Sequence, residues 1–99
     1  MSVKQYLPGS PPGESYLIFG YTPLCGTCKV AERMIDVLAV LTKQPVVKLD
    51  MNYTPELVQA FKVMSVPVLL VVNDDEVTAE VFKFESVTNL YEIVNKLLT

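Results

Sequence analysis

Leu24-Cys25-Gly26-Thr27-Cys28-Lys29 holds both cysteines of the chain, separated by two residues and placed between an apolar run and an amphipathic one. This spacing allows a disulfide to close across one helical turn. A thiolate at the start of a helix lies against backbone N–H groups without helical partners and against the positive end of the helix dipole, which lower its pKa toward neutral. The stretch therefore predicts thiol redox chemistry at the beginning of a helix.

Two other interpretations of the cysteine pair stay open. The pair could supply half of a tetrahedral zinc or iron–sulfur site, but the chain has no histidine, so the remaining ligands would be carboxylates or the cysteines of a second chain in a metal-bridged dimer. The cysteines could also be inert, and the chain could be a non-catalytic adaptor or a redox sensor. The absence of histidine excludes cysteine–histidine hydrolase chemistry. Redox exchange is the leading interpretation, with no metal and no cofactor.

Length and composition limit the class of protein. With 99 residues, 51% of them apolar, the chain is long enough for one core and too short for two. The net charge of -3 argues against nucleic acid or an anionic membrane as the main partner. The sequence has no apolar run long enough for a membrane span, and it does not begin with a cationic segment followed by an apolar stretch, so we expect no secretory leader. We therefore expect a soluble, cytoplasmic protein, and we also expect a monomer. A two-cysteine chain lacks the disulfide framework of small secreted proteins, which fits a reducing compartment.

The apolar pattern predicts the order β-α-β-α-β-β-α. Such an order predicts an α/β fold with a mixed four-stranded sheet and helices on both faces. The expected strands are 16–19, 46–49, 68–72 and 79–84, the expected helices are 26–42, 54–62 and 88–98, and residues 73–76 are expected to form a tight turn.

Residues 1–14 are expected to be a short N-terminal segment with a loop rich in proline and glycine, followed by a single domain over 15–99. At the last helix, Asn89 and Glu92 are spaced as a capping box, and Thr88 is an equally good N-cap.

With these elements in place, the chain resembles the thioredoxin-like family. Cys25 and Cys28 match its C-x-x-C motif after the first core strand, and Ser65-Val66-Pro67-Val68 falls where the family has a cis proline beside the disulfide. Lys48 matches a lysine common in thioredoxins. The resemblance covers roughly residues 16–98 and implies a thioredoxin-like fold whose N-terminal strand is truncated.

Three positions depart from the family pattern. Phe19, six residues before the first cysteine, stands where thioredoxins usually have a buried aspartate. Leu24 replaces an aromatic residue before the motif, and Thr27 replaces the usual proline within it. Because the aspartate serves as a base toward the second cysteine, its absence predicts a slower second step of disulfide exchange.

The resemblance together with thiolate chemistry implies a mechanism. Cys25 attacks a substrate disulfide, and Cys28 then attacks Cys25 and releases the reduced substrate. Without the aspartate, Lys48 or water would accept the proton of Cys28. The expected partners are protein disulfides and either a thioredoxin-reductase-type enzyme or a low-molecular-weight thiol. No glycine pair or basic cluster follows Pro67, which disfavours a glutaredoxin-like variant.

Substrate binding is expected around the motif and the predicted cis proline. Gly26 would allow close backbone approach, and the Thr27 hydroxyl can bond to a neighbouring sulfur. The segment 21–24 would form an apolar rim that includes Leu24. The backbone of Val66, before Pro67, would pair with an extended substrate as an added strand.

Overall fold

The first strand of the sheet, β1, Ser15–Tyr21, is buried along five consecutive residues. In the computed structural model, which describes residues 2–98, it pairs in parallel with β2, Val46–Asp50, and antiparallel with β3, Val68–Asn73. The last strand, β4, Glu76–Val81, is antiparallel to β3, which makes the order β2-β1-β3-β4. The predicted mixed four-stranded sheet is confirmed.

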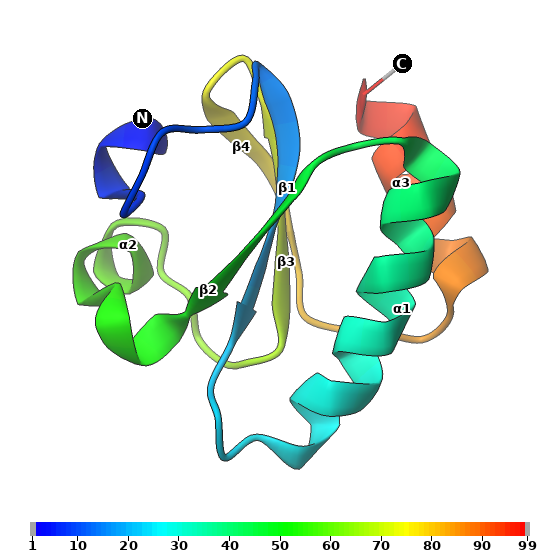
Figure 1. The fold of residues 1–99 in the computed structure, drawn as a ribbon, viewed down its shortest axis with the longest axis horizontal. Helices are drawn as coiled ribbons and strands as arrows, with labels where there is room; N and C mark the ends of the chain where they lie inside the picture. Colours follow the sequence, from blue (N-terminus) through cyan, green and yellow to red (C-terminus); the bar gives the residue numbers. More distant parts are fainter. Residues whose placement is uncertain (1, 99) are drawn as a thin grey trace.

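Helices cover both faces of this sheet (Figure 1). On one side lie α1, Gly26–Thr42, and α3, Val87–Leu98. On the other lie α2, Pro55–Ala60, and a short 3-10 helix, Lys4–Tyr6. A second 3-10 turn, Met51–Tyr53, connects β2 to α2. None of the helices within residues 2–98 is long and apolar enough to cross a bilayer.

Alternate residues of β1 belong to two separate hydrophobic cores. Leu17 and Phe19 pack in the core beneath α1 and α3, whereas Tyr16 and Ile18 pack in the core beneath α2. A strand that is buried on both faces needs apolar residues at every position, because neither face meets water. Each such side chain contributes about 1.5–3 kcal/mol when fully buried.

The N-terminal segment is held to the sheet through the β3–β4 turn. Ser2 forms a single antiparallel bridge with Glu76, and Val3 is fully buried. The Asp75 carboxylate accepts hydrogen bonds from the Ser2 hydroxyl and from the backbone N–H of Lys4, the latter at 2.9 Å. The predicted truncation of the N-terminal strand is therefore seen as one bridge followed by a 3-10 turn.

The position predicted for the fourth strand is wrong by three residues. The strand covers Glu76–Val81 and not 79–84, because the turn before it consists of only Asp74 and Asp75. Both have positive φ angles, 53° and 63°, as a two-residue hairpin turn of the primed kind requires.

Two helix ends also differ from the predictions. The helix predicted over 54–62 ends at Ala60, and Lys62 adopts a left-handed conformation with a φ of 53°. At the start of α3 the Ser86 hydroxyl accepts the backbone N–H of Asn89 at 3.0 Å, so Ser86 caps the helix instead of Thr88 or Asn89. Serine at this position satisfies one of the free N–H groups of the first turn.

Candidate active site

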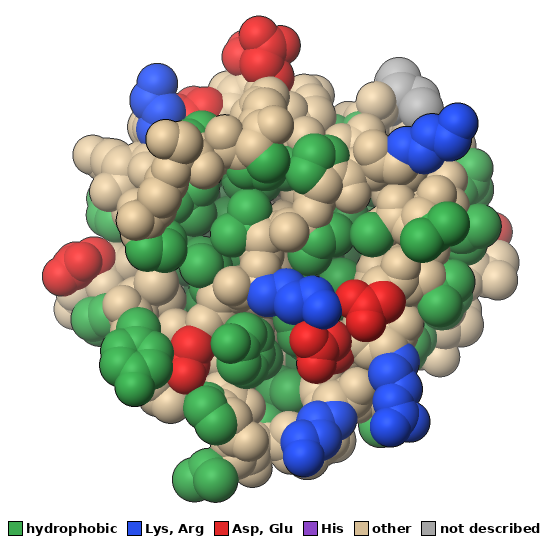
Figure 2. All heavy atoms as spheres, viewed as in Figure 1, with side chains coloured by type: hydrophobic (Ala, Val, Ile, Leu, Met, Phe, Trp, Pro, Cys, Tyr) green, Lys and Arg blue, Asp and Glu red, His purple; other side chains and the backbone are tan. Residues whose placement is uncertain are grey.

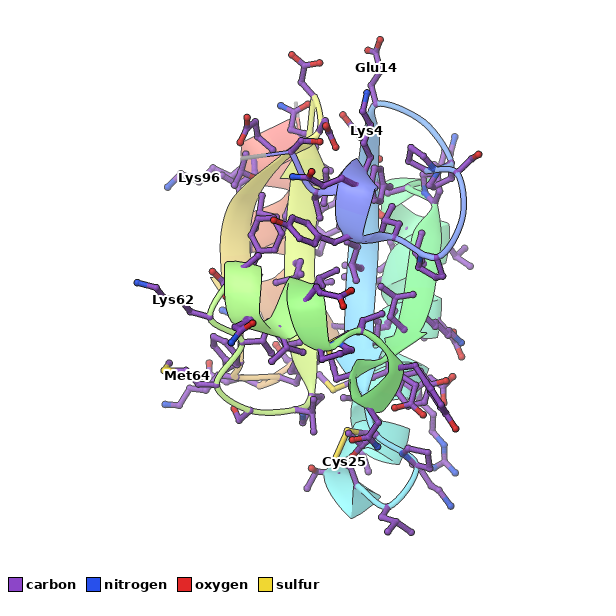
Figure 3. The ribbon with its side chains drawn as sticks, turned by 90° about the vertical axis from the view of Figure 1, so that its left-hand side faces the viewer. Lys4, Glu14, Cys25, Lys62, Met64 and Lys96 are labelled. Atoms are coloured by element: carbon purple, nitrogen blue, oxygen red, sulfur yellow. A yellow bond between two sulfur atoms is a disulfide. The ribbon has the colours of Figure 1, made fainter. Side chains whose placement is uncertain are left out.

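Cys25 and Cys28 form a disulfide at the start of α1, with their Cα atoms 5.3 Å apart. Figure 3 shows this bond at one end of the molecule, far from Lys4 and Glu14 at the other end. Cys25 is the N-cap of α1, and its sulfur accepts the backbone N–H of Cys28 at 3.2 Å. The Cys25 sulfur thus takes the place of the side-chain oxygen that usually satisfies a free N–H at a helix start.

The two cysteines differ in exposure. Cys28 is 4% exposed and belongs to the core beneath α1, whereas Cys25 is partly exposed. An incoming sulfur therefore reaches Cys25 more easily than Cys28. The division into an attacking and a resolving cysteine stays a prediction that this difference in exposure favours.

The two residues between the cysteines, Gly26 and Thr27, differ in their contacts. The Thr27 hydroxyl lies 3.3 Å from the Cys25 sulfur, which is the contact predicted for it. A Cβ atom at Gly26 would meet nothing within 4 Å, so packing inside the chain does not require glycine at this position.

A cavity of about 140 Å³ lies beside the disulfide. Its lining residues are Phe19, Tyr21, Thr22, Pro23, Cys25, Cys28, Lys29 and Glu32. Part of the predicted apolar rim therefore lies here, but Leu24 does not: its side chain is 99% exposed and projects into solvent.

Aromatic rings occupy the position of the family's buried acid. Phe19 is 1% exposed, stacks on Tyr21 with a centroid distance of 6.1 Å, and meets the edge of Phe84 at the same distance. The β1 side of the cavity is therefore apolar and holds no proton acceptor at this position.

A second hollow, of about 440 Å³, lies between α1 and the segment after β4. It brings Thr27 together with Pro67, and Phe82 and Phe84 contribute to its lining. The Val66–Pro67 peptide bond is cis, as the resemblance implies. Val66 itself packs against both cores and lines a different hollow with Met64. Met64 lies at the same end of the molecule as Cys25 (Figure 3).

Lys48 forms two ion pairs with α1. Its ammonium lies 2.8 Å from Glu32 and 2.9 Å from Asp36. The hydrogen bonds to Glu32 and Asp36 raise the pKa of Lys48, so its neutral form is rarer than that of an isolated lysine. Lys48 does not line the cavity that contains the cysteines, whereas Glu32 does.

Sequence reasoning missed Glu32 as a residue of the site. The available signal was its position four residues after Cys28 in a predicted helix, since residues at that spacing are neighbours on one face. That signal was weak, because a glutamate on an amphipathic helix is most often solvated.

The distribution of charged side chains and of possible metal ligands bears on the other interpretations of the site. Figure 2 shows one face of the molecule, where Lys and Arg side chains are scattered among acidic and apolar ones. Within the described part of the chain, no group of three or more His, Cys, Asp or Glu residues is arranged to hold a metal ion.

Comparisons with known proteins agree with this geometry. A family model described as Thioredoxin matches residues 11–98. The chain is 33% identical over 82 residues to the thioredoxin-like protein YusE of Bacillus subtilis, a match that covers 82% of this chain and 77% of the relative. It is 35% identical over 80 residues to a thioredoxin of the same organism, covering 79% and 77% of the two chains.

Among solved structures, a mutant thioredoxin from Halobacterium salinarum superimposes with a TM-score of 0.78 and 27% sequence identity. The superposition covers 85% of this chain and 74% of that one.

Proposed function

The chain belongs to the thioredoxin family, and we propose that it exchanges disulfides with protein substrates through the Cys25–Cys28 pair. The observation that carries the proposal is the placement of the pair, with Cys25 partly exposed as the N-cap of α1 and Cys28 buried one turn deeper. The free N–H groups and the dipole of the helix stabilise a thiolate at this position.

In the first step the Cys25 thiolate attacks one sulfur of a substrate disulfide. A Cys25–substrate disulfide forms, and the other substrate sulfur leaves as a thiolate. In the second step Cys28, after losing its proton, attacks the Cys25 sulfur. The Cys25–Cys28 disulfide forms, the substrate leaves with two thiols, and two electrons have passed from the protein to the substrate.

Substrate binding is proposed at the hollow shared by Thr27 and Pro67, with the backbone of Val66 pairing with an extended segment of the substrate. The fully exposed side chain of Leu24 adds an apolar contact beside the reactive sulfur. The aromatic rings at the hollow support this proposal, because they offer apolar surface beside the disulfide.

The oxidised pair must be reduced again after each cycle. We assign this step to a thioredoxin-reductase-type enzyme or a low-molecular-weight thiol, acting on a monomer in the cytoplasm. A reducing compartment suits a chain whose only two cysteines are a redox pair.

The test is reduction of insulin with dithiothreitol as the electron source. The wild-type protein should accelerate precipitation of the insulin B chain, and a Cys25→Ser variant should not exceed the rate with dithiothreitol alone. Equal rates for the two proteins would remove the enzymatic proposal and leave the adaptor interpretation.

A further inference from the structure

We propose that Glu32 accepts the proton of Cys28 during the second step of disulfide exchange and that Lys48 holds the Glu32 carboxylate in place. The inference rests on the proposed function. It assigns to a carboxylate on α1 the role for which the sequence predicts Lys48 or water.

The position of Glu32 supports this role. Glu32 and Cys28 are four residues apart on α1, so they lie on one face of the helix in successive turns. Both line the cavity beside the disulfide, and Glu32 is the carboxylate among its described lining residues. A water molecule occupies about 30 Å³ of liquid volume, so a cavity of about 140 Å³ has room for a water-mediated proton transfer.

Lys48 orients the carboxylate. One oxygen of Glu32 lies 2.8 Å from the Lys48 ammonium, and the Glu32 side chain is 44% exposed. The ion pair restrains a side chain that would otherwise sample many rotamers, and it leaves the second oxygen of Glu32 outside this contact. Lys48 thus acts through Glu32 and is a positioning residue.

The proton balance of the step is simple. The Cys28 thiol gives its proton, through a water in the cavity, to the Glu32 carboxylate. The Cys28 thiolate then forms a bond to the Cys25 sulfur as the bond from Cys25 to the substrate breaks. The departing substrate thiolate takes a proton from solvent, and the carboxylic acid of Glu32 returns its proton to solvent.

Several charged or titratable groups face Glu32 and enter the expected pH dependence. From β2 there is Lys48, from α1 there are Lys29 and Asp36, and across the cavity there is Tyr21 beside the cysteines. Asp36 binds the same ammonium as Glu32 at 2.9 Å but does not line the cavity. This difference makes Asp36→Asn the matched control for Glu32→Gln.

The experiment follows the reaction of reduced protein with 5,5′-dithiobis(2-nitrobenzoate) in a stopped-flow instrument. Attack by Cys25 releases one coloured thiolate, and resolution by Cys28 releases the second, so one trace reports both steps. General base catalysis is typically worth 10²–10⁴-fold, and solvent competes at a partly open cavity, so Glu32→Gln should slow the second phase about tenfold at pH 7. The first phase should stay within about twofold of the wild type, since Cys25 is not the proton donor in this step.

The pH profile of the second phase shows whether Glu32 acts as a base or only through the effect of its negative charge on the pKa of Cys28. Removing a negative charge near Cys28 lowers the pKa of its thiol, so a field effect alone makes the second phase faster, as expected for Asp36→Asn. Loss of a base makes it slower, and the deficit should vanish at high pH, where Cys28 ionises without help. Lys48→Gln should slow the second phase less in the Glu32→Gln background than in the wild-type protein, because Lys48 acts through the Glu32 carboxylate.

A second phase in Glu32→Gln that is as fast as in Asp36→Asn at every pH would overturn the assignment of Glu32. A missing first phase in the wild type would instead count against the proposed function, since Cys25 would then be unreactive.

Discussion

Phe19 and Lys48 are direct neighbours in the parallel pairing of β1 with β2, and both lie on the face covered by α1. Phe19 is buried, whereas the Lys48 ammonium reaches Glu32 and Asp36. The family's buried acid beside its lysine is therefore replaced by an aromatic ring, and the lysine binds carboxylates of the helix.

Phe19→Asp should restore a proton acceptor and destabilise the fold. Loss of a buried phenylalanine side chain costs about 3–5 kcal/mol, and a buried carboxylate adds a desolvation cost. Burial also raises the pKa of a carboxylate, which suits it to accept a proton near neutral pH. Urea unfolding and the second phase of the chromogenic reaction measure the two effects.

The matched control for that change is Phe19→Asn, because asparagine has nearly the same shape as aspartate but no charge. If Phe19→Asp, while still folded, resolves its mixed disulfide no faster than Phe19→Asn, then proton transfer at this position does not limit the reaction.

Cys28→Ser should accumulate a mixed disulfide with a protein substrate, because Cys25 attacks and nothing resolves the product. Cys25→Ser should accumulate none, since Cys28 is only 4% exposed. Non-reducing mass spectrometry of the two variants after incubation with oxidised insulin checks both outcomes. A mixed disulfide on Cys28 would reverse the roles of the two cysteines.

Thr27→Val should make the reduction potential of the cysteine pair more negative. In the reduced protein, the Thr27 hydroxyl can donate to the Cys25 thiolate from the position it holds 3.3 Å from that sulfur. A net hydrogen bond contributes about 1 kcal/mol, which corresponds to about 20 mV for a two-electron couple. Equilibration with glutathione buffers measures the potential, and Thr27→Ser should stay near the wild type. A shift of the same size in Thr27→Ser would refute the role of the hydroxyl.

Asp75→Asn should lower the melting temperature at pH 7, and this effect should shrink as the pH falls below the unfolded pKa of the carboxyl. The hydrogen bond from Ser2, aided by the N–H and charge of Lys4, holds the pKa of Asp75 below its usual value. An aspartate in the unfolded chain has a pKa of about 3.9. Because the pKa of Asp75 is lower in the folded protein, its carboxylate stabilises the fold above the unfolded pKa, and this stabilisation is lost as the pH falls through the folded pKa.

Melting curves over this pH range test the Asp75 prediction. Asparagine also tolerates the left-handed backbone at this position, so the turn itself should persist. Asp74→Asn is the control, because the hydrogen bonds from Ser2 and Lys4 go to Asp75. An equal loss in both variants would assign the effect to net charge.

Strong local signals made the fold and the cysteines predictable. The buried runs in β1 and β3 have no polar interruption, and α1 begins and ends where its apolar period predicts, at Gly26 and Thr42. The Thr27 contact with sulfur also followed from adjacency in the motif.

The misplaced strand and the unforeseen ion pairs came from contacts that depend on tertiary structure or on single backbone angles. The early start of β4 depends on two consecutive left-handed aspartates, a conformation that Gly favours more than Asp. Lys48 finds its partners 12 and 16 residues earlier in the chain, a pairing that exists only once β2 docks beside α1. No short-range sequence pattern predicts a contact between residues so far apart in the chain.

The attachment of Ser2 to Asp75 spans 73 residues of sequence, which orders events during synthesis. Because a ribosome makes a chain from its N-terminal side, Ser2, Val3 and Lys4 emerge before the β3–β4 turn, and their binding site does not exist until that turn has left the exit tunnel. These three residues therefore remain undocked until Asp75 has been made, with the apolar side chain of Val3 available to chaperones in the meantime. Once the β3–β4 hairpin has formed, Ser2 and Lys4 can bind Asp75, and Val3 can be buried.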